Sequence, residues 1–204
     1  MLDSKGFDLW ADGYDRTVGI SDEEDTYPFA GYREVLNGIY RIIMRKPGAA
    51  VLDIGFGTGA LTAKLYEHGY SVYGQDFSRR MIELASEKMP GARLYRGDFT
   101  EGLAAPLKER RYDFIVATYS LHHLNDEQKV PFLRELRDCL EDGGLILIGD
   151  VAFGTREELE RCRRSAGEEW DGEEFYFVAD ELRRAFPDLA FQRVSFCAGI
   201  LTLG

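Results

Sequence analysis

The sequence has few cysteines and no long apolar segment, and both absences narrow the class of protein. Only three cysteines occur among 204 residues, and their spacing matches neither a zinc-binding nor a redox motif. No apolar run approaches the roughly 20 residues that are needed to cross a bilayer. The first residues also lack the basic start and apolar stretch of a secretory signal. We therefore expect a cytoplasmic protein with reduced thiols and no membrane segment.

Basic residues are scarce relative to acidic ones. The chain has 25 Lys and Arg against 36 Asp and Glu, which gives a net charge of −11. Nucleic-acid binders gain affinity by neutralising phosphates, so this balance favours a small-molecule substrate over DNA or RNA. Hydrophobic residues are abundant, at 45% of the chain, which is enough for a packed core and, at this length, for one domain.

Apolar runs alternate with helical periods through the middle of the chain. Short apolar runs rich in branched residues predict buried strands, and amphipathic spacing predicts the helices between them. Ser78 is placed to cap the helix that follows the second strand, and Gly143–Gly144 is expected to end the helix before the fifth. The expected strands are 50–54, 71–75, 92–96, 112–118 and 145–149, and the expected helices are about 29–45, 59–69, 78–89 and 127–140.

The C-terminal region has a different pattern. Thr155 and Glu158 form a capping-box sequence that opens a short polar helix, and an acidic loop and a last helix of about 179–186 follow. Two strand-like runs, 191–196 and 200–203, are so close that they can only form an antiparallel hairpin. The predicted fold is a doubly wound α/β domain. Its mostly parallel, seven-stranded sheet ends in an antiparallel hairpin and has helices on both faces.

The stretch VLDIGFGTG, from Val51 to Gly59, ends the first strand in a glycine-rich loop. Its Gly-x-Gly-x-x-Ala spacing also satisfies the dinucleotide fingerprint, and Asp76 at the end of the second strand would suit the ribose of any adenosine ligand. A P-loop is excluded, because no Gly-Lys-Ser/Thr follows. Asp53 separates the remaining options, since a carboxylate at this strand end disfavours a pyrophosphate. It suits a cationic ligand without phosphate, such as S-adenosylmethionine.

Four motifs in order resemble those of the class I S-adenosylmethionine-dependent methyltransferases. The resemblance spans about residues 50–150, and the terminal hairpin extends it. The opening Phe7-x-x-Trp10-Ala11-x-x-Tyr14-Asp15 is similar to the start of many bacterial small-molecule members. The four motifs are Leu52-Asp53-x-Gly55-x-Gly57-x-Gly59, Gly74-Gln75-Asp76-Phe77-Ser78, Arg96-Gly97-Asp98-Phe99 and Leu140-x-x-Gly143-Gly144.

The resemblance implies a methionine end and an adenosine end of the cofactor site. Asp53 would meet the ammonium group, directly or through water. The residues that would line the rest of the methionine end are Gly55, Gly57, Gly59 and Thr118.

At the adenosine end, the resemblance implies that Asp76 binds both ribose hydroxyls and that Phe77 lies against the adenine. Asp98 and the backbone of Phe99 would contact the adenine amino group. Each aspartate also has a purely structural alternative: Asp76 could cap a helix, although Ser78 already suits that purpose, and Asp98 could simply hold a turn.

His122 and His123 follow the fourth strand, at the sheet edge where ligands bind. Either could act as a base, because the ordinary pKa of histidine is near neutrality, or both could merely organise the loop. We expect no metal site, since Asp126 and Glu127 are near but adjacent histidines should point in different directions. Tyr14 is a third catalytic candidate, whose ring could shield the sulfonium through a cation–π contact.

The expected function is methyl transfer from S-adenosylmethionine to a small-molecule acceptor by in-line displacement. A nicotinamide-dependent oxidoreductase and a non-catalytic cofactor-binding or regulatory module are the alternatives. No Asn-Pro-Pro-Tyr-like stretch follows the fourth strand, which disfavours methylation of amino groups on bases or glutamines. We expect one domain over 1–204, with an N-terminal cap (1–46), a cofactor-binding core (47–150) and an acceptor-side region (151–204).

Overall fold

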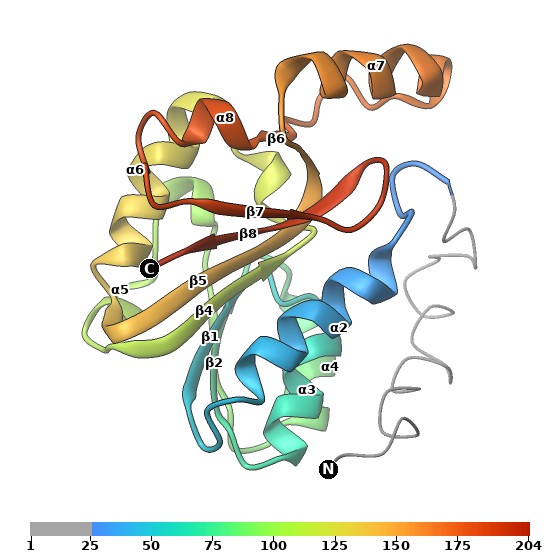
Figure 1. Ribbon diagram of the computed structural model, residues 1–204. Helices are drawn as coiled ribbons and strands as arrows, with labels where there is room; N and C mark the ends of the chain where they lie inside the picture. Colours follow the sequence, from blue (N-terminus) through green and yellow to red (C-terminus); the bar gives the residue numbers. More distant parts are fainter. Residues whose placement is uncertain (1–25) are drawn as a thin grey trace.

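The computed structural model describes residues 26–204, and these residues form an α/β fold around one large sheet (Figure 1). Seven strands lie in the order β3-β2-β1-β4-β5-β8-β7, and β6 pairs with β5 outside this path. The first five strands are parallel, and β8 is antiparallel to both of its neighbours. The predicted fold class is therefore confirmed. The strands are β1 Ala50–Ile54, β2 Ser71–Asp76, β3 Arg93–Arg96, β4 Tyr112–Thr118, β5 Leu140–Phe153, β6 Phe177–Val178, β7 Ala190–Arg193 and β8 Ala198–Leu203.

Helices cover both faces of this sheet (Figure 1). One face carries α2 (Tyr32–Ile43), α3 (Ala60–Glu67) and α4 (Arg79–Lys88). The other carries α5 (Ala105–Lys108), α6 (Asp126–Arg137) and α8 (Ala179–Leu182), and α7 (Arg156–Ala166) lies beyond the end of β5. Side chains alternate between the faces of a strand, so a sheet covered on both sides needs apolar residues at nearly every position. Successive residues of β1 accordingly enter different cores, Val51 toward α2 and Leu52 toward α6.

The predicted helix 127–140 is wrong at its C-terminal end. The helix α6 ends at Arg137, and Leu140 instead begins β5 by pairing with Tyr112 of β4. This strand pairing overrides the helical spacing of Leu140. Gly143 and Gly144 therefore do not stop a helix but lie within β5, where the register with β4 shifts. A Cβ atom on Gly144 would lie 2.9 Å from the backbone oxygen of Tyr112, so only glycine fits this irregularity.

In the second half of the chain, local capping sequences correctly predict where the helices begin. The capping box at Thr155 is present, because the side chains of Thr155 and Glu158 each accept a hydrogen bond from the other's backbone N–H. The last helix is shorter than predicted, and β7 ends at Arg193. Residues 194–197 form the turn of the hairpin, in which the backbone N–H of Val194 donates to Ala198 at 2.9 Å.

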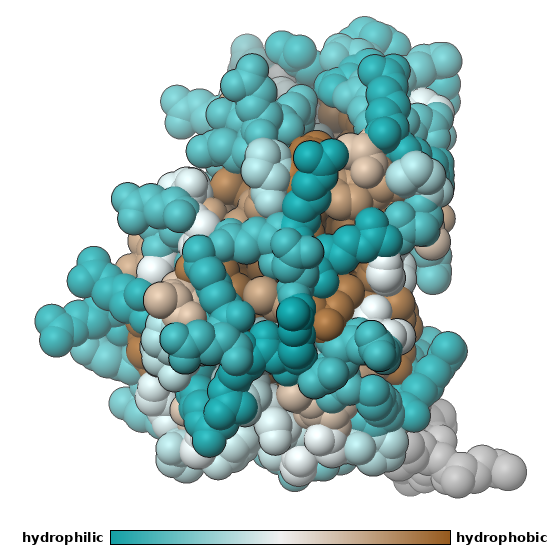
Figure 2. Space-filling view, turned by 90° about the vertical axis from the view of Figure 1, so that its left-hand side faces the viewer, coloured by the Kyte–Doolittle hydropathy of each residue, from teal (hydrophilic) through white to brown (hydrophobic). Residues whose placement is uncertain are grey.

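Figure 2 shows the side of the molecule that carries α5, α6 and α8. Hydrophilic side chains cover most of this face, with hydrophobic residues visible in the gaps between them. Within residues 26–204, no helix combines the length and apolar character that crossing a membrane would require.

Candidate active site

A cavity of about 340 Å³ lies at the carboxyl ends of β1 and β4. The chain leaves β1 toward one edge of the sheet and leaves β4 toward the other, so this is the topological switch point where α/β proteins bind ligands. The polar side chains that line the cavity are Tyr32, Asp53, Thr118, Tyr119, His122 and Glu174.

The glycine loop forms one wall of the cavity. Gly55 and Gly57 line it, and both have positive φ angles, of 68° and 56°. A Cβ atom on Gly55 would lie only 2.6 Å from the Cβ of Ser120, so the loop depends on the missing side chain. Gly59 has a different surrounding, because its Cβ position points to Met89, at 2.7 Å, where α3 packs against α4. Gly59 thus stabilises the loop through the packing of α3 on α4.

Asp53 is almost completely buried, at 1% exposure, and only one of its two carboxylate oxygens has a hydrogen-bond partner among the described residues. Its Oδ2 accepts a hydrogen bond from the hydroxyl of Thr62 at 3.1 Å, whereas Oδ1 has no partner among the described residues. Burial raises the pKa of Asp53 to about 7, and the nearby carboxylate of Asp76 acts in the same direction. A buried carboxylate oxygen without a partner, in a cavity, is suited to a cationic ligand.

Asp76 connects the glycine loop to the start of α4. Its Oδ2 accepts from the backbone N–H of Gly57 at 2.9 Å, and its Oδ1 accepts from that of Ser78 at 2.8 Å. The expected cap is also present, since Ser78 Oγ accepts from the backbone N–H of Met81. Beside this carboxylate, the ring of Phe77 is 64% exposed.

Asp98 and Phe99 follow β3. The exposed Asp98 holds the turn Phe99–Glu101, because its Oδ1 accepts from both the backbone N–H and the hydroxyl of Thr100, at 2.9 and 2.7 Å. The alternative role that the sequence suggested for Asp98 is therefore present in the structure, and Oδ2 accepts no hydrogen bond from the described residues. Phe99 is buried, and its ring packs against Phe132 of α6.

His122 is held between two carboxylates. Its Nδ1 lies 2.8 Å from Oδ1 of Asp150, and its Nε2 lies 3.3 Å from Oε1 of Glu174. Burial by itself would lower the pKa of His122, but the negative charges of Asp150 and Glu174 outweigh this effect, and the pKa lies above its ordinary value. The ring is thus placed at the cavity wall with one nitrogen anchored in the core.

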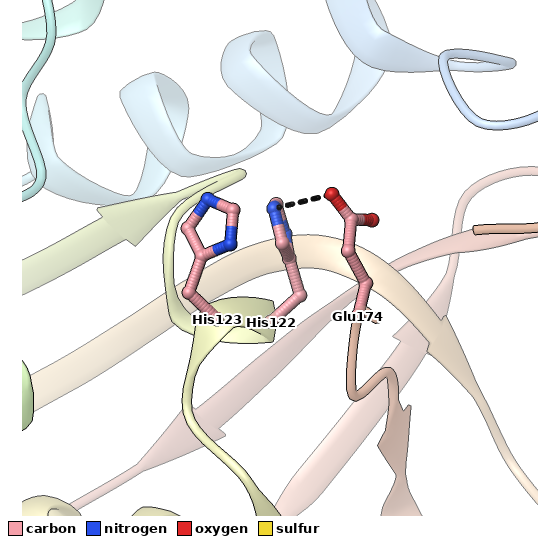
Figure 3. Close-up of side chains that lie close together, drawn as sticks. All are labelled: His122, His123 and Glu174. Atoms are coloured by element: carbon pink, nitrogen blue, oxygen red, sulfur yellow. Dashed lines mark ion pairs between the residues drawn. The ribbon is translucent and has the colours of Figure 1, made fainter. Parts of the chain in front are cut away.

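The two adjacent histidines do not point in different directions, and that geometric expectation is wrong. Their ring centroids are 4.3 Å apart, and Figure 3 shows both rings extending to the same side as Glu174. The 3₁₀ turn Leu121–His123 causes this, because it bends the chain directly after β4. The nearby carboxylate is Glu174, whereas Asp126, which is close to the histidines in sequence, pairs with Lys129. Partial burial and the neighbouring His122 lower the pKa of His123.

Three polar residues of the site were not found from the sequence. Tyr119 has a φ of +49°, rare for a residue other than glycine, and its buried hydroxyl has no partner among the described residues. Asp150 directly follows the predicted strand 145–149, at the edge of the sheet where ligands bind, and this place could have identified it. Glu174 ended the predicted acidic loop, and no local signal pointed to its contact with His122.

Aromatic rings form another part of the cavity wall. Phe29 and Tyr32 line it together with Tyr119, whose ring centroid lies 6.1 and 4.9 Å from theirs. The N-terminal candidate Tyr14 lies outside the described residues.

Comparison with known proteins identifies relatives of this chain. Residues 51–144 match the model of a methyltransferase domain. An uncharacterized methyltransferase of Geobacillus sp. (strain WCH70) is 39% identical over 181 residues, which are 88% of this chain and 80% of that protein. The uncharacterized methyltransferase YrrT of Bacillus subtilis (strain 168) is 34% identical over 197 residues, 94% of this chain and 86% of that protein.

Solved structures share the fold at lower identity. Magnesium protoporphyrin IX methyltransferase from Synechocystis PCC 6803, with bound SAH, superimposes with a TM-score of 0.68 at 20% identity and covers 98% of this chain and 94% of its own. DhpI in a complex with SAM and HEP gives a TM-score of 0.67 at 16% identity, and each chain is covered completely. These likenesses extend the match from residues 51–144 to the whole sheet and its terminal hairpin.

Proposed function

The chain belongs to the class I S-adenosylmethionine-dependent methyltransferases, and from this premise we propose that it methylates a small molecule bound in the cavity at the ends of β1 and β4. The observation that carries the proposal is the buried Oδ1 of Asp53, which has no partner among the described residues and belongs to a side chain that lines the cavity. A cavity with a carboxylate at one end and aromatic rings at its side suits a compact cationic cofactor and a small acceptor.

The methionine end of S-adenosylmethionine fits the cavity residues by chemistry. Asp53 would hold the ammonium group, which would stabilise the ionised carboxylate and give Oδ1 a partner. The backbone at Gly55 and Gly57 permits close approach, and Thr118 would lie under the same end. Gly59 would contribute indirectly, through the packing of α3 on α4.

The adenosine would extend over the ends of β2 and β3. Asp76 lies at the end of β2, where it would take the ribose hydroxyls while keeping its hydrogen bonds to the loop. The exposed ring of Phe77 would stack on the adenine, and this contact would explain its exposure. Asp98 would accept from the adenine amino group, with the Phe99 backbone beside it.

Methyl transfer needs little from the protein beyond alignment. When bound, the cofactor supplies an activated methyl carbon, whose bond to sulfur breaks as the acceptor atom attacks from the opposite side. The residues around the cavity would align the acceptor and exclude water. We place the acceptor's nucleophilic atom at the polar wall formed by His122 and Glu174, with His123 next to them, where a proton that the acceptor must lose can leave. Glu174 belongs to the region 151–204, which supports an acceptor-side role for that segment.

Two measurements test this proposal. In calorimetric titrations, S-adenosylmethionine and its demethylated product should bind and NADH should not, and Asp53→Asn should weaken binding of the first about tenfold or more because a charged hydrogen bond is lost. Binding of NADH alone would overturn the cofactor site. Incubation with methyl-labelled cofactor and a cytoplasmic extract should then place the label in the small-molecule fraction. Label found only in precipitated protein or nucleic acid would contradict the small-molecule acceptor.

A further inference from the structure

His122, His123 and Glu174 bring two imidazoles and a carboxylate together beside the cavity, which His122 and Glu174 line. Their nitrogen and oxygen ligand atoms all lie within 4.8 Å of one another. The histidines come from the turn after β4, and the glutamate comes from the segment before β6, so the cluster joins parts of the chain that are distant in sequence (Figure 3).

Several contacts fix the position of Glu174. The backbone N–H of Phe175 donates to the carbonyl of His122 at 2.8 Å, which ties this segment directly to the histidine turn. The buried Lys129 donates to the carbonyl of Phe175 from α6. The hydroxyl of Tyr176 donates to Oε2 of Glu174 at 2.6 Å and leaves Oε1 directed at His122.

The hydrogen bond to Asp150 determines how His122 can act. A carboxylate at 2.8 Å requires a proton on Nδ1, which places the ring's lone pair on Nε2 when the imidazole is neutral. That lone pair faces a carboxylate oxygen of Glu174 at 3.3 Å. Two acceptors at this distance repel each other unless a positive charge lies between them. The charge can be a proton on Nε2 or a metal ion.

The 3.3 Å between Nε2 of His122 and Oε1 of Glu174 agrees with a metal ion bound between them. Two ligand atoms about 2.1 Å from one tetrahedral ion lie about 3.4 Å apart. A histidine whose other nitrogen donates to a buried carboxylate is also the common arrangement of metal-binding histidines, because the carboxylate fixes the tautomer and the ring orientation. Asp150, which is fully buried, provides this contact.

We propose that His122 Nε2, His123 and Glu174 Oε1 bind one divalent transition-metal ion, preferably Zn²⁺. Imidazole and carboxylate together favour Zn²⁺ over Mg²⁺ and Ca²⁺, which prefer sites made of oxygen atoms alone. A tetrahedral ion with three protein ligands has one coordination position left for a molecule in the cavity. The role of this ion rests on the proposed function: it would bind the acceptor's nucleophilic atom and favour loss of its proton to solvent before the methyl group is transferred. Binding of the ion itself does not depend on that function.

The test is a calorimetric titration of chelator-treated, desalted full-length protein with Zn²⁺. We expect one equivalent to bind to the wild type. His123→Ala and Glu174→Gln should each weaken binding at least about tenfold. The matched controls are His68→Ala, which removes the one other histidine of the chain, and Glu173→Gln, which changes the exposed neighbouring glutamate. Both controls should bind like the wild type.

Titration with Co²⁺ gives an independent signature, because bound Co²⁺ absorbs visible light according to its ligands. The wild-type absorption should be lost in His123→Ala and Glu174→Gln and retained in both controls. No binding to the wild type, or equal binding to all variants, would overturn the site and indicate that a proton bridges His122 and Glu174. Thermal unfolding should show that each variant is folded.

Titration of the same proteins with the cofactor tests the metal site and the proposed function separately. Titration with S-adenosylmethionine should give similar affinities for the wild type and for the two metal-site variants. A wild type that binds the cofactor but not Zn²⁺ would overturn only the metal site. A wild type that binds Zn²⁺ but not the cofactor would contradict only the cofactor site.

Discussion

Nδ1 of His122 lies 2.8 Å from Oδ1 of Asp150, a carboxylate that is fully buried in β5. The same oxygen accepts the backbone N–H of the next residue of β5, Val151, at 2.8 Å, so the carboxylate is oriented by its own strand. The orientation of the ring at the cavity wall is therefore set by the core of the sheet and not by the loop that carries the histidine.

Replacing this carboxylate should change the titration of the ring. In Asp150→Asn, we expect the pKa of His122 to fall, because the carboxylate stabilises the imidazolium and an amide does not. NMR titration of the ring protons in the presence of a chelator would measure the shift, and His68 in the same spectra is the internal control. An unchanged His122 pKa would mean that Asp150 does not act on the ring.

Asp53 should make the stability of the protein depend on pH. Its pKa is about 7 in the folded protein against an ordinary value of 3.8, so the folded state binds more protons than the unfolded state between these values. The free energy of unfolding should therefore fall as pH rises through this window, by on the order of 2–4 kcal/mol.

The variant Asp53→Asn lacks this titration and is the control. The difference in unfolding free energy between variant and wild type, measured by urea denaturation at pH 5 and pH 8, should move in favour of the variant at pH 8. A difference that does not change with pH would show that Asp53 has an ordinary pKa in the folded protein.

Asp76→Ala should weaken binding of S-adenosylmethionine by about 1–3 kcal/mol, because charged hydrogen bonds to the ribose would be lost. Calorimetry would measure the change, and Asp142→Ala, at an exposed position, is the matched control. Since Asp76 also accepts from two backbone N–H groups, the loss of unfolding free energy should be measured separately. Unchanged cofactor affinity would refute the ribose contact.

Alanine substitutions at two glycines with positive φ would separate the cost of backbone strain from the cost of a steric collision. Gly69 has a φ of 82° and open space around its Cβ position, so Gly69→Ala should cost about 1–2 kcal/mol of unfolding free energy. Gly55→Ala adds a collision with Ser120 and should cost about 1–3 kcal/mol more. Urea denaturation of both variants would compare them, and equal losses would show that the glycine loop can move away from β4.

Sequence reasoning succeeded where the determining interactions are local. Ser78 caps α4 and Thr155 caps α7, because each bonds to a backbone group three residues away. The strands Ala50–Ile54 and Tyr112–Thr118 have the predicted bounds, since apolar residues at nearly every position mark a strand that is buried on both faces. It failed at Leu140, whose helical spacing was overruled by pairing with Tyr112, a partner on another strand.

The sequence by itself determined the alternation of strands and helices, the glycine loop and the aspartate in front of it, because hydrophobic periodicity and turn chemistry are written in neighbouring residues. Only the tertiary structure decided that Glu174 meets His122, that two adjacent histidines share one side, and that a strained Tyr119 faces the cavity. These relationships depend on which distant segments pack together, and the free energy of that packing is spread over the whole core. A short stretch of sequence therefore does not determine which distant segments pack together.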